Sequence, residues 1–225
     1  MIFITLVDIK PGLDEEAYGA LEALKGEGGV TPLLIGRIFE EADVLLLLHS
    51  EELEALDDYL IVNVRGLPAA EELVVVPIYE FVLLPSFDSV VEIEGSADEG
   101  PAEGPIEAPA EPEELLMFMA RVDVAPGMDR GVHRAVASLR PEDVDIIPLM
   151  AGHTFHSKEF DLVLFFLANS LEAAWEFGKQ LRALDGVWDT YFSLVAHFEA
   201  MVPLWRFREY TSRGRTSDPV VTGSG

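Results

Sequence analysis

The residues of this sequence whose types could do chemistry are mainly histidines, and the closest pair is His153 and His156. The H-x-x-H spacing places them on opposite faces of an extended strand, so both reach one metal ion only if a turn begins between them. His197 lies in a late apolar segment, where an inward-facing imidazole would act as a base or as an axial haem ligand. The competing interpretation for each is a turn, surface or hydrogen-bonded structural histidine. The sequence therefore assigns no catalytic residue and no metal site.

The elements that must position these residues occur twice along the chain. The hexapeptide "VDIKPG" at 7–12 returns as "VDVAPG" at 122–127. After each copy, the hydrophobic spacing predicts a helix (13–24 and 128–139) and then two apolar strands (31–39 with 44–50, and 147–155 with 162–168). A second helix and a last strand follow in both copies. Each half therefore has the β-α-β-β-α-β order of a ferredoxin-like unit.

The prolines and the apolar strands together predict how the two units combine. Pro32 and Pro148 fall in second strands and Pro77 in a fourth strand, which are the edge positions of a ferredoxin-like sheet. The third strands, "VLLLLHS" and "LVLFFLA", are apolar on both faces, so both faces must be buried. We expect the second face to be covered by the sheet of the other unit. The predicted fold class is α+β, with two ferredoxin-like repeats forming an intramolecular dimeric α/β barrel.

Composition divides the chain into four parts. Residues 1–85 form the first repeat and residues 115–203 the second. Residues 86–114 are rich in Pro, Gly, Ala and acids and contain no lysine or arginine, which is typical of a linker. Residues 204–225 form a tail in which arginines alternate with aromatic residues.

The quoted motifs, the aspartate that opens the third strand in "ADVLLLL" and "FDLVLFF", and the segment "LEAAWEFGKQLRALDGVWDT" resemble the ligand-sensing domain of the Lrp/AsnC family. The wider dimeric α/β-barrel superfamily, which includes small monooxygenases and haem-binding proteins, shares these motifs. The resemblance implies an effector site near the glycine and aspartate of each repeat, which are Gly36 with Asp43 and Gly152 with Asp161. The chain departs from the family because the first strand starts at residue 2 and no basic recognition helix is present. DNA binding is therefore not implied.

Three more residues complete the predicted ligand-binding set. Arg37 occupies in the first repeat the position that His153 occupies in the second, and a fused dimer can specialise at such divergent positions. A guanidinium near the space between the sheets would suit an anionic ligand. His197 is included because its strand lines that space. Surface pairing of Arg37 with Glu40 or Glu41 is the competing interpretation.

Charge and composition limit the partners. The net charge is −26, which disfavours direct contact with nucleic acid. There is no cysteine, and no apolar run is long enough to span a bilayer, so we expect a cytoplasmic protein without membrane attachment. A small-molecule effector, a protein partner and a homo-oligomer are the partners that we expect.

Three function classes remain open. The leading hypothesis is a non-catalytic module that senses a small ligand or binds a protein, with no cofactor. The alternative is a haem-binding protein or cofactor-free monooxygenase that uses His197 or His153 and the cavity between the sheets. A structural subunit of a larger oligomer, assembled through edge strands, is the third. The sequence does not establish an enzyme and inclines against one.

Overall fold

The computed structural model describes residues 1–39, 42–87, 90, 115–139, 145–154 and 160–212. The first repeat contains β1 (Ile2–Ile9), α1 (Asp14–Glu22), β2 (Val30–Ile38), β3 (Val44–Ser50), α2 (Leu53–Leu60) with a π-helical turn (Ile61–Arg65), and β4 (Ala70–Leu83). The second contains β5 (Leu116–Val124), α4 (Asp129–Ala137), β6 (Ile146–Thr154), β7 (Leu162–Ala168), α5 (Leu171–Arg182) and β8 (Val187–Ala200). A 3-10 turn (Leu204–Arg206) and α6 (Phe207–Ser212) follow. His156 and most of the predicted linker lie outside the described residues, and the division of the chain at residue 85 stays a prediction.

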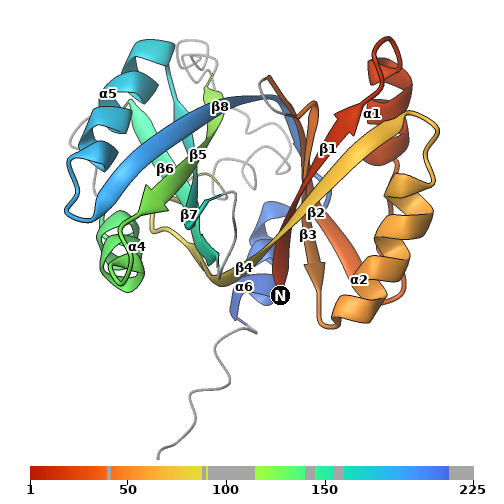
Figure 1. Ribbon diagram of the computed structural model, residues 1–225, viewed down its shortest axis with the longest axis horizontal. Coiled ribbons are helices and arrows are strands. Elements are labelled where there is room, and N and C mark those ends of the chain that lie inside the picture. Colours follow the sequence, from red (N-terminus) through yellow and green to blue (C-terminus); the bar gives the residue numbers. More distant parts are fainter. Residues whose placement is uncertain (40–41, 88–89, 91–114, 140–144, 155–159, 213–225) are drawn as a thin grey trace, which may run out of the picture.

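The strands form one closed antiparallel barrel in the order β1-β3-β2-β8-β5-β7-β6-β4. Figure 1 shows α1 and α2 on one flank of the barrel and α4 and α5 on the other, each pair covering the strands of its own repeat. The predicted α+β barrel of two ferredoxin-like repeats is therefore confirmed. None of the helices within the described ranges is long and apolar enough to cross a bilayer.

Two junctions close the barrel, and we name them the β2–β8 seam and the β4–β6 seam. Each joins the second strand of one repeat to the fourth strand of the other. The predicted edge strands are therefore edges only within their own repeat. Because every barrel strand has two neighbours, the proposed assembly through free edge strands has no edge to use.

The prolines mark where each seam begins. The strand prolines pair on one side only, inside their own repeat: Pro32, Pro77 and Pro148. Cross-seam pairing starts shortly after them, at Leu34, Ile78 and Met150. A proline lacks the N–H that a second ladder would need, so its position limits how far each seam can extend.

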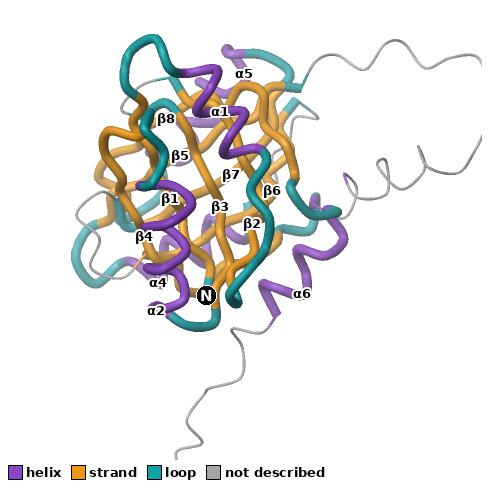
Figure 2. Tube along the Cα trace, turned by 90° about the vertical axis from the view of Figure 1, so that its right-hand side faces the viewer, coloured by secondary structure: helices purple, strands orange, loops and turns teal. Residues whose placement is uncertain are grey.

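The barrel interior is a continuous apolar core that α6 closes at one end. Phe207 of α6 is fully buried in this core, and its ring lies 5.9 Å from that of Phe87. Figures 1 and 2 both place α6 at the end of the barrel where the N-terminus lies. Burying a phenylalanine-sized side chain contributes about 1.5–3 kcal/mol. The first residues of the predicted tail are thus part of the folded core.

Gly36 and Gly152 face the interior at the two seams, where the neighbouring strand comes very close. A Cβ on Gly36 would lie 2.3 Å from Val195 Cγ1, and a Cβ on Gly152 would lie 2.2 Å from Ile78 Cγ2. The structure therefore gives these two glycines a packing role, which the sequence-based interpretation did not consider.

We predict that Gly152→Ala lowers the free energy of unfolding by about 1–3 kcal/mol, the usual cost of overpacking a core. Urea denaturation followed by circular dichroism measures the change. Gly131→Ala is the matched control, because no atom lies within 4 Å of the added Cβ on α4. The control should be neutral or more stable by up to about 1 kcal/mol, since alanine favours helix. Equal midpoints for the two variants would contradict the close approach.

Candidate functional site

The predicted ligand-binding residues lie at the seams rather than around an open inter-sheet cavity. Arg37 on β2 and His153 on β6 occupy equivalent positions, as the sequence indicated, and pair across the seams with Ala196 and Tyr79. Their side chains face outward, toward α1 and α4. The interior between the sheets is filled by apolar side chains.

At the β2–β8 seam the structure brings Arg37 and His197 together. The Arg37 guanidinium forms two hydrogen bonds with the Glu15 carboxylate, at 2.9 and 2.8 Å, and its Cζ lies 4.4 Å from the centre of the Tyr18 ring. Tyr18 Oη donates to the carbonyl oxygen of His197. The hydrogen bond with Glu15 raises the pKa of Arg37. The partner of Arg37 is therefore Glu15, whereas Glu40 and Glu41 lie outside the described residues.

His197 does not project into the barrel as a base or axial ligand would. It has a φ of 47° at a bulge in β8, where the cross-seam register shifts. The bulge removes it from the regular alternation of inward and outward side chains, and its side chain is exposed.

At the β4–β6 seam two histidines replace the arginine and tyrosine. His153 Nε2 lies 4.0 Å from Asp129 Oδ1, and the His153 ring lies 6.2 Å from that of His133 on α4. His133 Nδ1 lies 3.6 Å from Glu80 Oε2, and Glu80 has a φ of 50° at the bulge in β4. Within the described ranges, no group of three or more His, Asp or Glu side chains could hold a metal ion.

Asp43 and Asp161 have equivalent structural contacts in the two repeats. Asp43 Oδ2 accepts a hydrogen bond from the Ile9 backbone N–H, and Asp161 Oδ2 accepts one from the Val124 N–H, both at 2.7 Å. Both N–H groups lie just beyond the last pair that the first strand of the repeat forms with its third strand, Val7 with Val44 and Val122 with Leu162. The aspartate side chains thus extend the contact between the first and third strands of each repeat, and a ligand role for them stays a prediction.

A larger groove lies elsewhere, at the end of the barrel closed by α6. Its volume is about 600 Å³, and we name it the α6 groove. Its lining consists of Gly26, Glu27, Gly28, Gly29, Val30, Thr31, His49, Glu51, Glu52, Ala55, Arg206, Glu209 and Tyr210. These residues come from the glycine-rich turn before β2 and the first residues of β2, from the end of β3, from the start of α2, and from the 3-10 turn with α6. The volume is within the range of small-molecule sites, about 300–1,000 Å³.

Two aromatic rings meet at the base of this groove. His49 is 4% exposed, and its ring lies 4.9 Å from that of Tyr210 at an angle of 51°. Arg206 lies 5.9 Å from the Tyr210 ring and 3.5 Å from Glu209. Glu27 accepts a hydrogen bond from Asn63. The groove thus combines one buried imidazole, one phenol and one guanidinium with four carboxylates.

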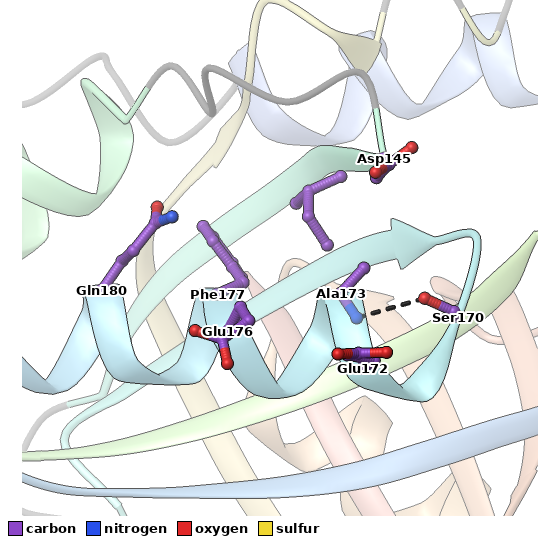
Figure 3. A pocket seen from close by; sticks show the side chains of 8 residues that line it. Asp145, Ser170, Glu172, Ala173, Glu176, Phe177 and Gln180 are labelled. Atoms are coloured by element: carbon purple, nitrogen blue, oxygen red, sulfur yellow. Dashed lines mark hydrogen bonds between the residues drawn. The ribbon is translucent and has the colours of Figure 1, made fainter.

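The equivalent groove of the second repeat is smaller, about 250 Å³, and α6 does not contribute to it. Figure 3 shows its acidic lining along the first turns of α5, with Ser170 Oγ accepting from the Ala173 N–H. Leu167 in β7 occupies the position equivalent to that of His49 in β3. The larger groove is therefore a specialised copy of a site that both repeats possess.

The sequence-based interpretation missed two inward-facing polar positions. His49 is one of them, and the sequence signal for it is a histidine in "VLLLLHS" at the position where "LVLFFLA" has a leucine. Arg121 on β5 is 6% exposed and lies opposite Tyr191, with its Cζ 6.0 Å from the ring centre. The first repeat has Leu6 at that position. Nearby, burial together with Asp161 and Asp189 raises the pKa of Asp123.

Comparisons with known proteins identify the fold and no family. No protein-family model matches the chain, and no curated protein matches it. Among solved structures, the siroheme decarboxylase NirDL aligns with a TM-score of 0.55 at 10% identity, covering 95% of this chain and 79% of that one. Its co-complex with an iron-uroporphyrin III analogue gives 0.53 at 10% identity, with the same coverage. A monooxygenase-like protein of Lactobacillus acidophilus NCFM gives 0.51 at 12% identity, covering 89% and 95%.

These similarities correct the leading functional hypothesis. The non-catalytic sensing or interaction module was wrong as the main interpretation, because the structures that share the fold over most of both chains are described as enzymes. The dimeric α/β-barrel fold is shown, whereas the specific likeness to the Lrp/AsnC sensing domain is not confirmed. The expected effector, protein partner, homo-oligomer and cytoplasmic location stay predictions.

We predict that Asp161→Ala lowers the free energy of unfolding by about 1–3 kcal/mol, because it leaves the Val124 N–H without its acceptor. Asp161→Asn should lose less, since its amide oxygen can still accept. Thermal and urea denaturation measure both changes. Asp58→Ala on the exposed face of α2 is the control and should be close to neutral. An unchanged stability of Asp161→Ala would show that the contact does not support this end of the β5–β7 ladder.

Proposed function

We propose that this protein is an enzyme that binds a small organic substrate in the α6 groove and oxidises it with dioxygen, without a haem. The observation that carries the proposal is the groove of about 600 Å³ with the buried imidazole of His49 packed on Tyr210 at its base. A concave site with a few convergent polar groups is the usual form of a small-molecule site. The fold shared with a monooxygenase-like protein supports the reaction class.

His49 would act as the general base. In cofactor-independent oxygenation the substrate must be a weak C–H acid whose anion is stabilised by conjugation, such as the CH₂ group between two aromatic rings. His49 takes the proton, and the carbanion adds to dioxygen to give a peroxide anion on carbon. The protonated imidazole returns the proton, and the hydroperoxide loses water to leave a ketone. One O₂ is consumed, and one ketone and one water form for each CH₂ group oxidised.

The other groove residues would hold the substrate. The Tyr210 ring gives a surface on which an aromatic substrate can stack. Arg206 lies beside that ring and is suited to the oxygen atoms of a phenol or carbonyl group. Helix α6 would therefore have a binding role as well as a packing role.

The groove next to α6 and the two seam histidines do not fit a tetrapyrrole. An iron-uroporphyrin carries many carboxylates, whereas this groove has Glu27, Glu51, Glu52 and Glu209 against Arg206, and the whole chain has a net charge of −26. The imidazole of His49 is also packed against Tyr210 rather than facing a flat apolar slot. His153 and His197, the histidines expected to serve a haem, lie at the seams and face away from the barrel interior. The proposed reaction therefore uses no haem.

We predict that the purified protein consumes dioxygen with aromatic compounds that carry an activated CH₂ group, and that His49→Phe lowers kcat by at least about 100-fold. The expected loss is the contribution of a general base, about 10²–10⁴-fold, while phenylalanine preserves the packing on Tyr210. An oxygen electrode together with chromatography of the ketone measures the reaction.

Glu172→Gln in the smaller groove is the matched control and should leave kcat unchanged. Titration with iron porphyrin, followed by absorbance, is a second readout. A Soret band that requires His49 would replace this proposal with tetrapyrrole binding. Equal turnover in His49→Phe and the unsubstituted protein would remove His49 from the mechanism.

A further inference from the structure

The two seams are equivalent in backbone but differ in the side chains that support them. On the β2–β8 side, Arg37 is paired bidentately with Glu15, and the Tyr18 hydroxyl donates to the backbone of the bulge residue His197. On the β4–β6 side, His153 replaces Arg37 and His133 replaces Tyr18. One seam is therefore supported by an arginine and a phenol that do not change protonation near neutral pH, and the other includes His133, a residue type that can.

His133 occupies a poor place for a positive charge. Its side chain is 8% exposed, and its Nε2 is buried without a hydrogen-bond partner among the described residues. On β4, Glu80 Oε2 lies 3.6 Å from Nδ1, which is longer than a hydrogen bond. A proton on both ring nitrogens would leave a buried N–H without an acceptor.

The remaining charged groups around the two imidazoles do not compensate. His153 on β6 faces His133 at 6.2 Å and would repel it if both were charged. Asp129 at the start of α4 has its Oδ1 4.0 Å from His153 Nε2. On the same helix, Arg134 Nε donates to the Arg130 carbonyl at the exposed surface. The strand β7, which also packs against α4, contributes only apolar residues, Leu162–Ala168.

The bulge at Glu80 depends on this arrangement. A glutamate at φ 50° is a strained backbone that surrounding contacts must hold. In the β2–β8 seam the equivalent strain at His197 is held by the Tyr18 hydroxyl. In the β4–β6 seam the group of α4 nearest the bulge is the His133 imidazole, whose Nδ1 lies 3.6 Å from Glu80 Oε2.

We propose that the β4–β6 seam is a pH-sensitive joint between the two repeats, which loosens when His133 is protonated while the β2–β8 seam stays closed. The opened seam would let Nε2 reach water, while the attraction between the protonated imidazole and Glu80 would limit the extent of the opening. Since this seam joins the repeats, loosening it would open one side of the barrel.

The direction of the pH effect follows from burial. Burial lowers the pKa of His133 below its ordinary value, the nearby His153 lowers it further, and Glu80 opposes both. The closed seam therefore binds the proton less readily than the opened seam. The stability of the closed seam is intact above the ordinary histidine pKa, near 6.5, and decreases as the pH falls below it. Asp8 and Asp123 have raised pKa values and act in the opposite direction, so the test must be local to each seam.

Hydrogen–deuterium exchange of the full chain at pH 7.5 and 5.5, corrected for intrinsic exchange rates, tests the proposal. We expect the opening constant of amides in β4 (Ile78–Leu83) and β6 (Met150–Thr154) to rise by at least about fivefold at the lower pH. Uptake of one proton on opening can raise this constant by up to about tenfold per pH unit. Amides of the β2–β8 seam should change by less than about twofold.

Two variants decide whether His133 is responsible. His133→Tyr copies the residue of the other seam and should remove the pH dependence, and His133→Gln removes the charge without adding a ring in case the tyrosine does not fold. Glu172→Gln should keep the dependence of the unsubstituted protein. An equal change in both seams, or a pH dependence that persists in either His133 variant, would overturn the proposal.

Discussion

Closure of the barrel is the constraint on which the rest of the structure depends. The central strands of both repeats are apolar on both faces, so neither sheet can leave a face in water. The second strand of each repeat meets the fourth strand of the other, and the backbone ladders become continuous. This closure explains the small residues Gly36 and Gly152, because a side chain there would collide with the strand across the seam. It also explains why each proline lies just before a seam begins.

Duplication in one chain allows equivalent positions to diverge. In a symmetric dimer, a change such as His49 for Leu167 or Arg121 for Leu6 would occur on both sides at once. Here each occurs on one side only, and α6 covers only one of the two equivalent grooves. The structure therefore concentrates its specialised residues in one groove, at one seam and at one inward position, while the apolar barrel between them stays intact.

The position of the groove is a consequence of the same closure. Apolar side chains fill the barrel interior, so a ligand site must lie at an end or on the outside. The end next to α6 is covered by residues from after the last strand, which lie far in sequence from β3 and α2. His49 and Tyr210 are 161 residues apart in the chain and yet pack ring against ring.

The sequence by itself determined the repeat, the order of elements, the positions of the prolines and the burial of both strand faces, and these were sufficient to predict the barrel. These features are local or periodic, so they are readable without tertiary contacts. The tertiary structure alone decided which side chains meet. His197 was expected to face inward, but a bulge turns it out; His153 was expected near a cavity, but packing fills that space. The groove depends on a contact between β3 and a helix after the second repeat, and no periodicity in the sequence encodes such a contact. Side-chain direction at a bulge and docking of a distant helix follow from three-dimensional packing, and for that physical reason they could not be predicted from spacing.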